Sequence, residues 1–235
     1  MSELDRAVEE IRKRRPRRVV AFTGAGVSAD SGIPTFRGPD GLWRNFRAED
    51  LATPEAFQRD PILVWEWYEW RRGLIRKAQP NAAHTAIAQL PDAVVVTQNV
   101  DDLHARAGAR DVVELHGNIF RVRCEREKKT FVREEPLRRL PPRCECGAIL
   151  RPDVVWFGEM LPEEAIARAS AAIMGADLLL VVGTSGVVYP AAGLVSLHRG
   201  LSIEINPQPG SSCAFAIAAR AAEAVPQIVE AILTA

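Results

Sequence analysis

The sequence has no long apolar run and no excess of charge of either sign. No apolar stretch approaches the roughly 18 residues that a membrane-spanning helix needs, so we expect no transmembrane segment. Lys and Arg together number 30, as do Asp and Glu, and the formal net charge is therefore zero. This balance argues against the broad basic surface of a nucleic-acid-binding protein. We read the dense cations of Arg12–Arg18 as an exposed helix end followed by a strand.

Cysteine is also scarce, with four residues in a chain of 235. Acidic residues near the amino terminus, among them Glu3 and Asp5, argue against a secretory signal or a transit peptide, and we expect a soluble cytoplasmic protein. Cys124, Cys144 and Cys146 nevertheless lie in one segment. In a reducing compartment such a cluster suggests a metal site before a disulfide.

Short apolar runs, often β-branched, alternate along the chain with stretches of helical spacing. The predicted strands are Arg17–Phe22, Ala93–Thr97, Asp111–Leu115, Leu178–Val182 and Leu201–Ile205. The predicted helices are Leu4–Arg15, Pro61–Lys77, Ala82–Leu90, Asp101–Ala107, Glu163–Met174 and Ala221–Leu233. Strands without polar alternation, separated by helices, are typical of an α/β fold in which a Rossmann-like parallel sheet carries helices on both faces.

Two segments do not fit this sheet. Residues 38–78 are rich in tryptophan and mostly helical in pattern, whereas residues 121–152 are charged, contain prolines and carry three cysteines. We assign both to a small inserted module, helical and zinc-ribbon-like, in a chain long enough for one full core and a satellite. Residues 1–37, 79–120 and 153–235 then form the sheet domain.

The turn Gly24-Ala25-Gly26 follows the first predicted strand and precedes a predicted helix. Small residues here let the backbone approach a pyrophosphate, and free N–H groups at the helix start hold the anion. Two glycines after a strand are as often simple turn chemistry. The acidic residue of dinucleotide oxidoreductases, about 20 positions further on, is missing, because Asp50 falls in a helical region rather than at a strand end. An ordinary dehydrogenase is therefore disfavoured.

Polar residues also follow the other predicted strands, at the sheet edge where open α/β sheets bind ligands. His116 closes the third strand, and an imidazole titrates close enough to neutral pH to serve as a base without a large pKa shift. A lone histidine is more often structural, and we apply that interpretation to His84, His104 and His198.

Four blocks of the sequence together resemble the sirtuins, a family of NAD-dependent protein lysine deacylases. They are Gly24–Arg37, Thr97–His104, Leu115–Gly117 and Gly183–Ser185, in the family's order and over nearly the whole chain. The resemblance implies an enzyme that removes acyl groups from the lysine side chains of proteins. Such an enzyme consumes NAD as a co-substrate and releases nicotinamide and O-acyl-ADP-ribose.

The resemblance also implies roles for individual residues. His116 is the implied catalytic base, which activates a ribose hydroxyl. Phe36 would lie beside the nicotinamide and Arg37 near phosphate, while Asn99 and Asp101 would meet the nicotinamide and the ribose. The implied NAD-binding set is Gly24, Ala25, Gly26, Phe36, Arg37, Trp43, Gln98, Asn99, Asp101, Gly183, Thr184, Ser185, Asn206 and Ala221.

The segment Val154–Glu159 resembles the peptide-binding edge of the family. An exposed extended segment can pair with a substrate backbone, and the implied contacts are Val154, Phe157, Gly158 and Glu159. The alternative is a core strand in which Trp156 packs inward.

Tyr68 and Arg71 are three residues apart and share one face of a predicted helix. By itself the pattern is more typical of an aromatic helix packed on the core, with arginines at its rim. The pair resembles the Tyr-x-x-Arg signature of class III sirtuins, in which it lines the acyl pocket. A guanidinium binds a carboxylate through two hydrogen bonds, and the resemblance therefore implies desuccinylase and demalonylase activity beside some deacetylase activity.

The cysteines depart from the family's usual two Cys-x-x-Cys pairs, which supply four ligands to zinc. Glu127 stands where the partner of Cys124 is expected, and Cys144-x-Cys146 is one residue short. Three thiolates with Glu127 or water can still bind a structural zinc. Equally, the incomplete site can be a decayed one, in a module held by packing alone.

Two other functions share the cofactor blocks. A related domain that hydrolyses NAD or transfers ADP-ribose needs no acyl-lysine tunnel, and Tyr68, Arg71 and Val154–Glu159 argue against it. A non-enzymatic nucleotide-binding module would leave His116 and Asn99 idle. We expect acylated protein lysines as partners, no nucleic-acid or membrane partner, and a monomer.

Overall fold

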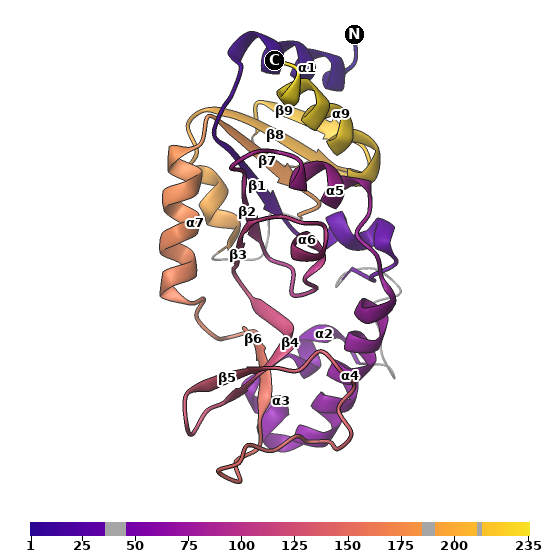
Figure 1. Ribbon diagram of the computed structural model, residues 1–235, viewed down its shortest axis with the longest axis vertical. Helices are drawn as coiled ribbons and strands as arrows, with labels where there is room; N and C mark the ends of the chain where they lie inside the picture. Colours follow the sequence, from indigo (N-terminus) through magenta and orange to yellow (C-terminus); the bar gives the residue numbers. More distant parts are fainter. Residues whose placement is uncertain (36–45, 185–190, 211–212) are drawn as a thin grey trace.

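The computed structural model describes residues 1–35, 46–184, 191–210 and 213–235. A six-stranded parallel sheet in the order β3-β2-β1-β7-β8-β9 forms its larger part (Figure 1). The strands are β1 (Val19–Thr23), β2 (Val94–Thr97), β3 (Asp111–Glu114), β7 (Leu178–Val182), β8 (Leu201–Asn206) and β9 (Phe215–Ala218). The predicted Rossmann-like fold is confirmed. Five strands lie at the predicted runs, and β9 was not predicted.

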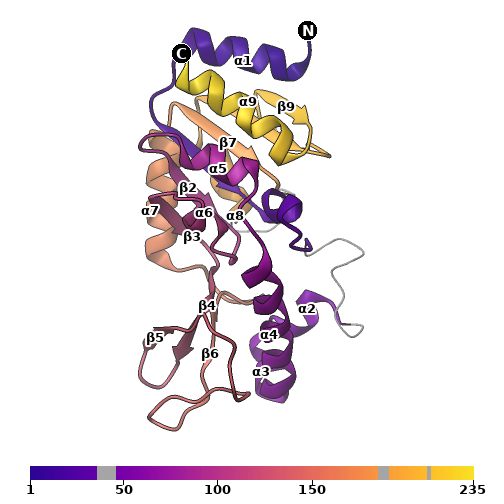
Figure 2. The same cartoon turned by 45° about the vertical axis from the view of Figure 1, so that its right-hand side comes forward.

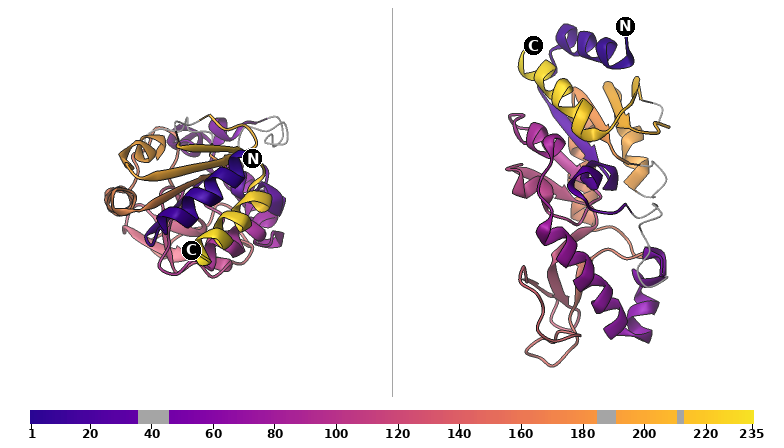
Figure 3. Two further views of the ribbon diagram at one scale, coloured as in Figure 1. Left: turned by 90° about the horizontal axis from the view of Figure 1, so that it is seen from above. Right: turned by 90° about the vertical axis from the view of Figure 1, so that its right-hand side faces the viewer.

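The two faces of the sheet are covered by different helices (Figure 1, Figure 3). One face carries α1 (Glu3–Arg14), α5 (Ala82–Ala88) and α9 (Ala221–Leu233), and the other carries α7 (Glu163–Gly175), α8 (Ala191–Leu194) and η3 (Val195–Leu197). Successive residues of a strand face opposite sides, so Val19 and Ala21 of β1 join the first core and Val20 and Phe22 join the second. Burial on both faces explains why the central strands are apolar throughout.

A smaller three-stranded antiparallel sheet lies below the large one (Figure 2). It contains β4 (Gly117–Cys124), β5 (Lys129–Val132) and β6 (Arg151–Val154), and it packs with α2 (Ala48–Leu51), α3 (Pro54–Arg59) and α4 (Pro61–Lys77) around one apolar core. The Trp65 indole donates a hydrogen bond of 2.8 Å to the carbonyl of Leu150 across that core. We propose the division into a sheet domain and an inserted module. The second core supports it, and this core also takes in Ile119 and Trp156 from the ranges assigned to the sheet domain.

The helix α4 has the bounds that its sequence predicts. Asp60 caps its first turn through a 3.0 Å bond from the amide of Leu63, and Pro61 occupies the first position. Arg72 is fully buried, and its guanidinium donates to the carbonyl of Ile119 at 2.8 Å. Neither α4 nor any other helix in the described parts of the chain is long and apolar enough to cross a membrane.

Candidate active site

Segments that carry predicted site residues follow four strands and meet at the carboxyl edge of the large sheet. They follow β1 at Gly24–Gly26, β2 at Gln98–Asp101 and β7 at Gly183–Thr184, and Asn206 ends β8. Because the strands are parallel and adjacent, their carboxyl ends lie along one side of the sheet. The structure thus brings together residues that the sequence spreads over most of the chain.

The glycine turn packs directly against the turn that follows β7. The Gly26 amide donates to the carbonyl of Gly183 at 2.8 Å, and the Gly24 amide donates to that of Val182 at 3.0 Å. A Cβ on Gly183 would lie 2.3 Å from the nitrogen of Val27, and the φ of Gly183 is +62°. The glycines are therefore needed for the close approach of two backbones.

The helix that the sequence predicts after this turn is the short 3₁₀ helix η1 (Ala25–Ser31). The amides of Gly24 and Gly26 donate to backbone carbonyls at the end of β7 and just after it. Gly24, Ala25 and Gly26 can still shape a phosphate site by leaving room for it, but these two N–H groups do not supply its hydrogen bonds.

Asn99 and Asp101 form a buried hydrogen-bonded group with Ser28. The Ser28 hydroxyl donates to the Asp101 carboxylate at 2.7 Å, and the Asn99 amide donates to the Ser28 hydroxyl at 3.2 Å and to the Gly24 carbonyl at 3.1 Å. Burial raises the pKa of Asp101, whose side chain is nearly inaccessible. Sequence reasoning did not select Ser28, although it lies within the glycine block and its hydroxyl contacts both predicted residues.

Two buried histidines lie beneath this group. The rings of His84 and His104 are 4.7 Å apart, and His104 Nε2 lies 3.0 Å from the hydroxyl of Thr23. Burial lowers the pKa of His84 to about 4 and that of His104 to about 3. Both rings are therefore neutral at physiological pH. They pack beneath the Ser28 group, as expected for histidines with a structural role. The short helix α6 (Leu103–Arg106) carries His104.

His116 is oriented by a backbone carbonyl. Its Nδ1 lies 2.8 Å from the carbonyl oxygen of Gln98. A carbonyl only accepts, so Nδ1 carries the proton and Nε2 presents a lone pair. Burial lowers the pKa of His116. The ring is therefore neutral near pH 7 and able to accept a proton.

Gln98, Thr184 and Asn206 form a chain of hydrogen bonds across the sheet edge. The Gln98 side-chain amide donates to the Thr184 hydroxyl at 3.0 Å, and the Asn206 amide donates to the Thr184 carbonyl at 2.7 Å. This chain joins the ends of β2, β7 and β8. Three predicted cofactor contacts are thus held by one another, and a ligand at this edge would meet them as a preformed set.

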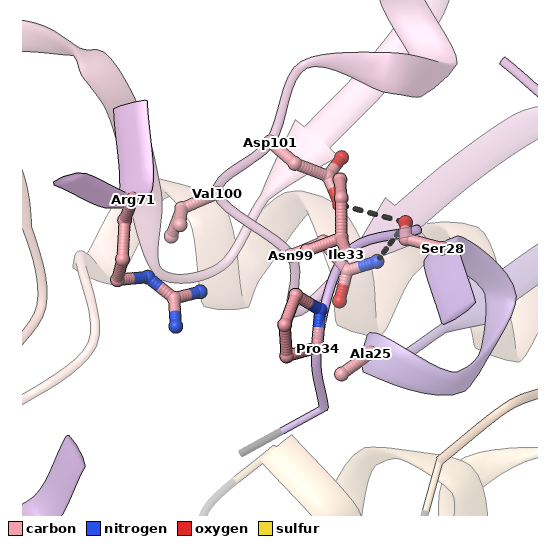
Figure 4. Close-up of a pocket in the computed structure, with 8 residues that line it drawn as sticks. All are labelled: Ala25, Ser28, Ile33, Pro34, Arg71, Asn99, Val100 and Asp101. Atoms are coloured by element: carbon pink, nitrogen blue, oxygen red, sulfur yellow. Dashed lines mark hydrogen bonds between the residues drawn. The ribbon is translucent and has the colours of Figure 1, made fainter. Parts of the chain in front are cut away.

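A small cavity lies where α4 approaches this edge. Figure 4 shows the Arg71 guanidinium turned toward it, and its lining consists of Ala25, Ser28, Ile33, Pro34, Arg71, Asn99, Val100 and Asp101. Burial lowers the pKa of Arg71, and the nearby Tyr68 and Asp101 raise it in part. The guanidinium lies 5.4 Å from the ring centroid of Trp67. Arg71 therefore shares one cavity with Asn99 and Asp101, which the helical pattern alone did not predict.

Tyr68 lies one turn before Arg71 and is buried. Its hydroxyl accepts a 2.9 Å hydrogen bond from the indole N–H of Trp156, and burial raises the pKa of Tyr68. The hydroxyl accepts in that bond and does not use its own proton there. The Tyr-x-x-Arg pair thus lies between the core of the smaller sheet and the cavity. Tyr68 packs in the core, as expected for an aromatic helix packed on it, whereas Arg71 lines the cavity.

The segment Val154–Glu159 is partly buried. Val154 ends β6, an edge strand of the smaller sheet, and Trp156 packs inward. The Glu159 carboxylate binds the Arg151 guanidinium at 2.6 and 2.8 Å, so it is paired within the chain. Phe157 is 43% exposed, and Gly158 follows it with a φ of +85°. Of the predicted peptide contacts, Phe157 and Gly158 are the accessible ones.

Five predicted NAD contacts remain, and the structure describes one of them, Ala221. Phe36, Arg37, Trp43 and Ser185 lie outside the described residues. Ala221 is buried at the start of α9, next to Arg220, which forms an ion pair with Asp30 of η1. Ala221 therefore lies close to the segment that follows the glycine turn.

The three predicted metal ligands converge at the far end of the smaller sheet. Cys124 ends β4, and Cys144 and Cys146 belong to one tight turn that runs from Cys144 to Gly147. All three sulfurs lie within 4.8 Å of one another. We call these three residues the cysteine cluster. The shortened spacing of Cys144 and Cys146 does not prevent convergence, because Cys146 Sγ lies 3.6 Å from Cys124 Sγ. The cluster is compatible with a structural zinc ion.

Comparison with known proteins links this geometry to one family. The profile of the Sir2 family matches residues 24–190. The NAD-dependent protein deacylase of Pyrococcus furiosus is 53% identical over 230 residues, which cover 91% of this chain and 92% of the relative. A solved complex of a Sir2 homologue with NAD superimposes with a TM-score of 0.89 at 45% identity, covering 96% of this chain and 94% of that one. A Sir2 protein solved with a deacetylated p53 peptide and 3′-O-acetyl ADP-ribose gives a TM-score of 0.81 at 31% identity, covering 95% and 97%.

Proposed function

We propose that this chain, a member of the Sir2 family and an NAD-dependent protein deacylase, removes succinyl and malonyl groups from protein lysines. We expect acetyl groups to be poorer substrates. One observation carries the acyl preference. Arg71 reaches the cavity that Asn99 and Asp101 line, one helical turn from the buried hydroxyl of Tyr68.

The carboxyl edge of the sheet has the features that NAD requires. The glycines of the turns after β1 and β7 pack closely against one another, and buried amide and carboxylate groups line the adjacent cavity. We infer that Thr184 and Asn206 hold the adenosine half and that Asn99 and Asp101 hold the nicotinamide half. Bound NAD supplies the ribose carbon that gives up nicotinamide and takes the acyl oxygen.

His116 is assigned as the general base, with Nε2 as the accepting atom. The Gln98 carbonyl fixes the tautomer, and burial keeps the pKa of the ring below its ordinary value. A neutral imidazole of this kind accepts a hydroxyl proton and later returns it. General base catalysis of this type contributes about 10²–10⁴-fold in rate.

Arg71 is assigned as the residue that recognises an acidic acyl group. Its guanidinium is partly desolvated, and a carboxylate in the cavity compensates a desolvated cation through two parallel hydrogen bonds. A hydrogen bond to a charged group contributes roughly 1.5–3 kcal/mol. Such a bond favours succinyl or malonyl over acetyl lysine by about ten- to a hundredfold. The Tyr68 hydroxyl, one helical turn away, is assigned as a second donor to the same carboxylate.

The activity is tested with acetyl-, malonyl- and succinyl-lysine peptides, each incubated with and without NAD. NAD-dependent release of nicotinamide together with O-acyl-ADP-ribose supports deacylation, whereas nicotinamide release without acyl transfer identifies an NAD hydrolase. His116→Ala provides the inactive reference. Release of free acid instead of O-acyl-ADP-ribose contradicts the proposed reaction.

The acyl preference is tested with Arg71→Met. We expect kcat/KM for the succinyl peptide to fall about ten- to a hundredfold while that for the acetyl peptide changes little. Arg76→Met is the matched control, because Arg76 lies on the same helix and donates to the Glu134 carbonyl at 2.7 Å. Equal losses on both peptides would refute the role of Arg71 without affecting the deacylase assignment.

A further inference from the structure

Trp156 links the segment Val154–Glu159 to α4, the helix that carries Tyr68 and Arg71. Its indole N–H donates a hydrogen bond of 2.9 Å to the Tyr68 hydroxyl. Both side chains are almost fully buried, with exposed fractions of 3% for Trp156 and 4% for Tyr68. A hydrogen bond in such surroundings is stronger than one in water, so it holds the two groups in one arrangement.

The chemistry of the indole determines the direction of this bond. An indole N–H only donates, so the Tyr68 oxygen must accept. A hydroxyl proton rotates about the C–O bond to suit its surroundings, and the bond from Trp156 prevents it from turning toward the indole. Burial raises the pKa of Tyr68, so the hydroxyl keeps its proton. Tyr68 is therefore a donor that is directed away from Trp156.

The indole is itself held in place by residues outside α4. The Arg151 guanidinium lies 3.5 Å from the centroid of the Trp156 ring, and the Phe57 ring centroid lies 5.1 Å from it. The Trp156 backbone amide donates to the Glu159 carboxylate at 2.8 Å, and that carboxylate also binds Arg151. Because both its backbone and its ring are held, Trp156 is a fixed point against which the Tyr68 hydroxyl is oriented.

We propose that Trp156 is a positioning residue for acidic acyl groups, because its N–H turns the Tyr68 hydroxyl proton toward the carboxylate that Arg71 binds. This inference rests on the proposed preference for succinyl and malonyl lysine. Tyr68 and Arg71 share one face of α4, and Arg71 lines the cavity. A hydroxyl that is already oriented loses less rotational freedom when the carboxylate binds. An acetyl group has no carboxylate, so its removal does not depend on this orientation.

The proposal is tested on the 235-residue chain with Trp156→Phe, which removes the N–H and keeps an aromatic ring. Trp65→Phe is the matched control, because Trp65 is buried in the same core and its indole donates to the Leu150 carbonyl at 2.8 Å. Both substitutions are made alone and combined with Tyr68→Phe. For each variant kcat and KM are measured separately with succinyl and acetyl peptides at saturating NAD, and urea unfolding measures stability.

We expect Trp156→Phe to lower kcat/KM for the succinyl peptide about two- to tenfold, mainly through a higher KM, because the orientation of one hydrogen bond is lost. In the Tyr68→Phe background the same substitution should have no further effect on that peptide, since no hydroxyl remains to be oriented. Trp65→Phe should also lower stability, yet it should leave the ratio of succinyl to acetyl kcat/KM unchanged.

A decrease that is equal for both peptides, or that persists in the Tyr68→Phe background, would overturn the positioning role. Unchanged succinyl kinetics in a folded Trp156→Phe would overturn it as well. Tyr68→Phe alone keeps the test valid if Trp156→Phe folds poorly, because an undiminished succinyl preference without the hydroxyl contradicts the proposal. These outcomes leave the proposed function intact, whereas the absence of a succinyl preference in the unaltered protein would refute both.

Discussion

The carboxyl edge of the large sheet and the inserted module are stabilised by different kinds of contact. At the sheet edge, backbone meets backbone, as in the bond from Gly26 to Gly183, and short polar side chains are buried between the turns. In the module, single long side chains cross the core, as Trp65 does to the Leu150 carbonyl and Arg72 to that of Ile119.

This difference explains where the sequence departs from the family pattern. A backbone contact depends on the absence of a side chain, and few substitutions keep it. A side-chain contact can be replaced by another side chain that reaches the same place. The blocks at the sheet edge match the family closely, whereas the departures, Glu127 and the shortened Cys144-x-Cys146, fall in the module.

The largest effect is expected from Gly183→Ala, at the contact between the two turns. The new Cβ would lie 2.3 Å from the Val27 nitrogen, and the residue has a φ of +62°. Backbone strain and overpacking together cost about 2–6 kcal/mol of unfolding free energy. Gly73→Ala is the control, since nothing lies within 4 Å of its Cβ position and an alanine inside α4 adds about 0.5–1 kcal/mol. Similar urea midpoints for the two variants would show that the turns tolerate separation.

A smaller loss is expected from Arg72→Met in the module. The substitution removes the buried donor to Ile119 and to Glu135, and it should lower the free energy of unfolding by about 3 kcal/mol. Arg76→Met, with a partly exposed side chain, should lose less than about 1 kcal/mol. NAD affinity, measured by calorimetry, should stay unchanged in both. Loss of NAD binding in Arg72→Met alone would show that the two regions are not separable.

Acid should weaken the sheet edge through His84 and His104. Their pKa values in the folded protein, about 4 and about 3, lie below the ordinary value of 6.5, so the unfolded chain binds protons first as pH falls. Stability therefore declines from about pH 6.5 down to about pH 4, by about 1.4 kcal/mol per pH unit for each histidine. His84→Asn should reduce the slope of unfolding free energy against pH by about that amount. An identical slope would mean that this ring does not titrate on unfolding.

The smallest effect is expected from Trp67→Phe, where the module meets the sheet edge. The Arg71 guanidinium lies 5.4 Å from the centroid of the buried indole, and cation–π contacts contribute about 0.5–2 kcal/mol. Loss of part of this contact should lower kcat/KM for the succinyl peptide about two- to fivefold, because the guanidinium is less firmly placed. The acetyl peptide is the internal control. A parallel decline on both peptides would indicate a general loss of packing.

Much of the fold follows from local pattern. The bounds of α4 and α9 match the predicted ranges. Apolar periodicity indicates both helices, Asp60 caps the first turn of α4, and a loop precedes α9. The strand β9 was missed because its sequence, Phe-Ala-Ile-Ala, has weak strand propensity and forms by pairing with β8. The predicted helix from Asp101 was too long, because Asp102 adopts a φ of +59° and the helix starts at Leu103.

The site divides in the same way. His116, Asn99 and Asp101 could be selected because each follows a strand within a block that matches the family. The occupied amides of Gly24 and Gly26 could not be foreseen, because their acceptors come from a turn about 160 residues away. Ser28 was likewise missed, since its role depends on contact with Asp101, 73 residues further on. Local sequence indicates which groups are present but not which distant groups they contact.

The strand order also determines when the site can form during synthesis. β1 is made well before β7, yet it pairs with β7, in the register of Val19 with Leu178. Chains emerge from the ribosome amino terminus first, at about 5–20 residues per second. Val20 and Phe22, both buried in the finished sheet, thus stay exposed on one face until β7 and α7 have been made. A nascent chain that ends before Gly183 has its glycine turn without the backbone it packs against, so chaperones can recognise it and proteases can cleave it throughout that interval.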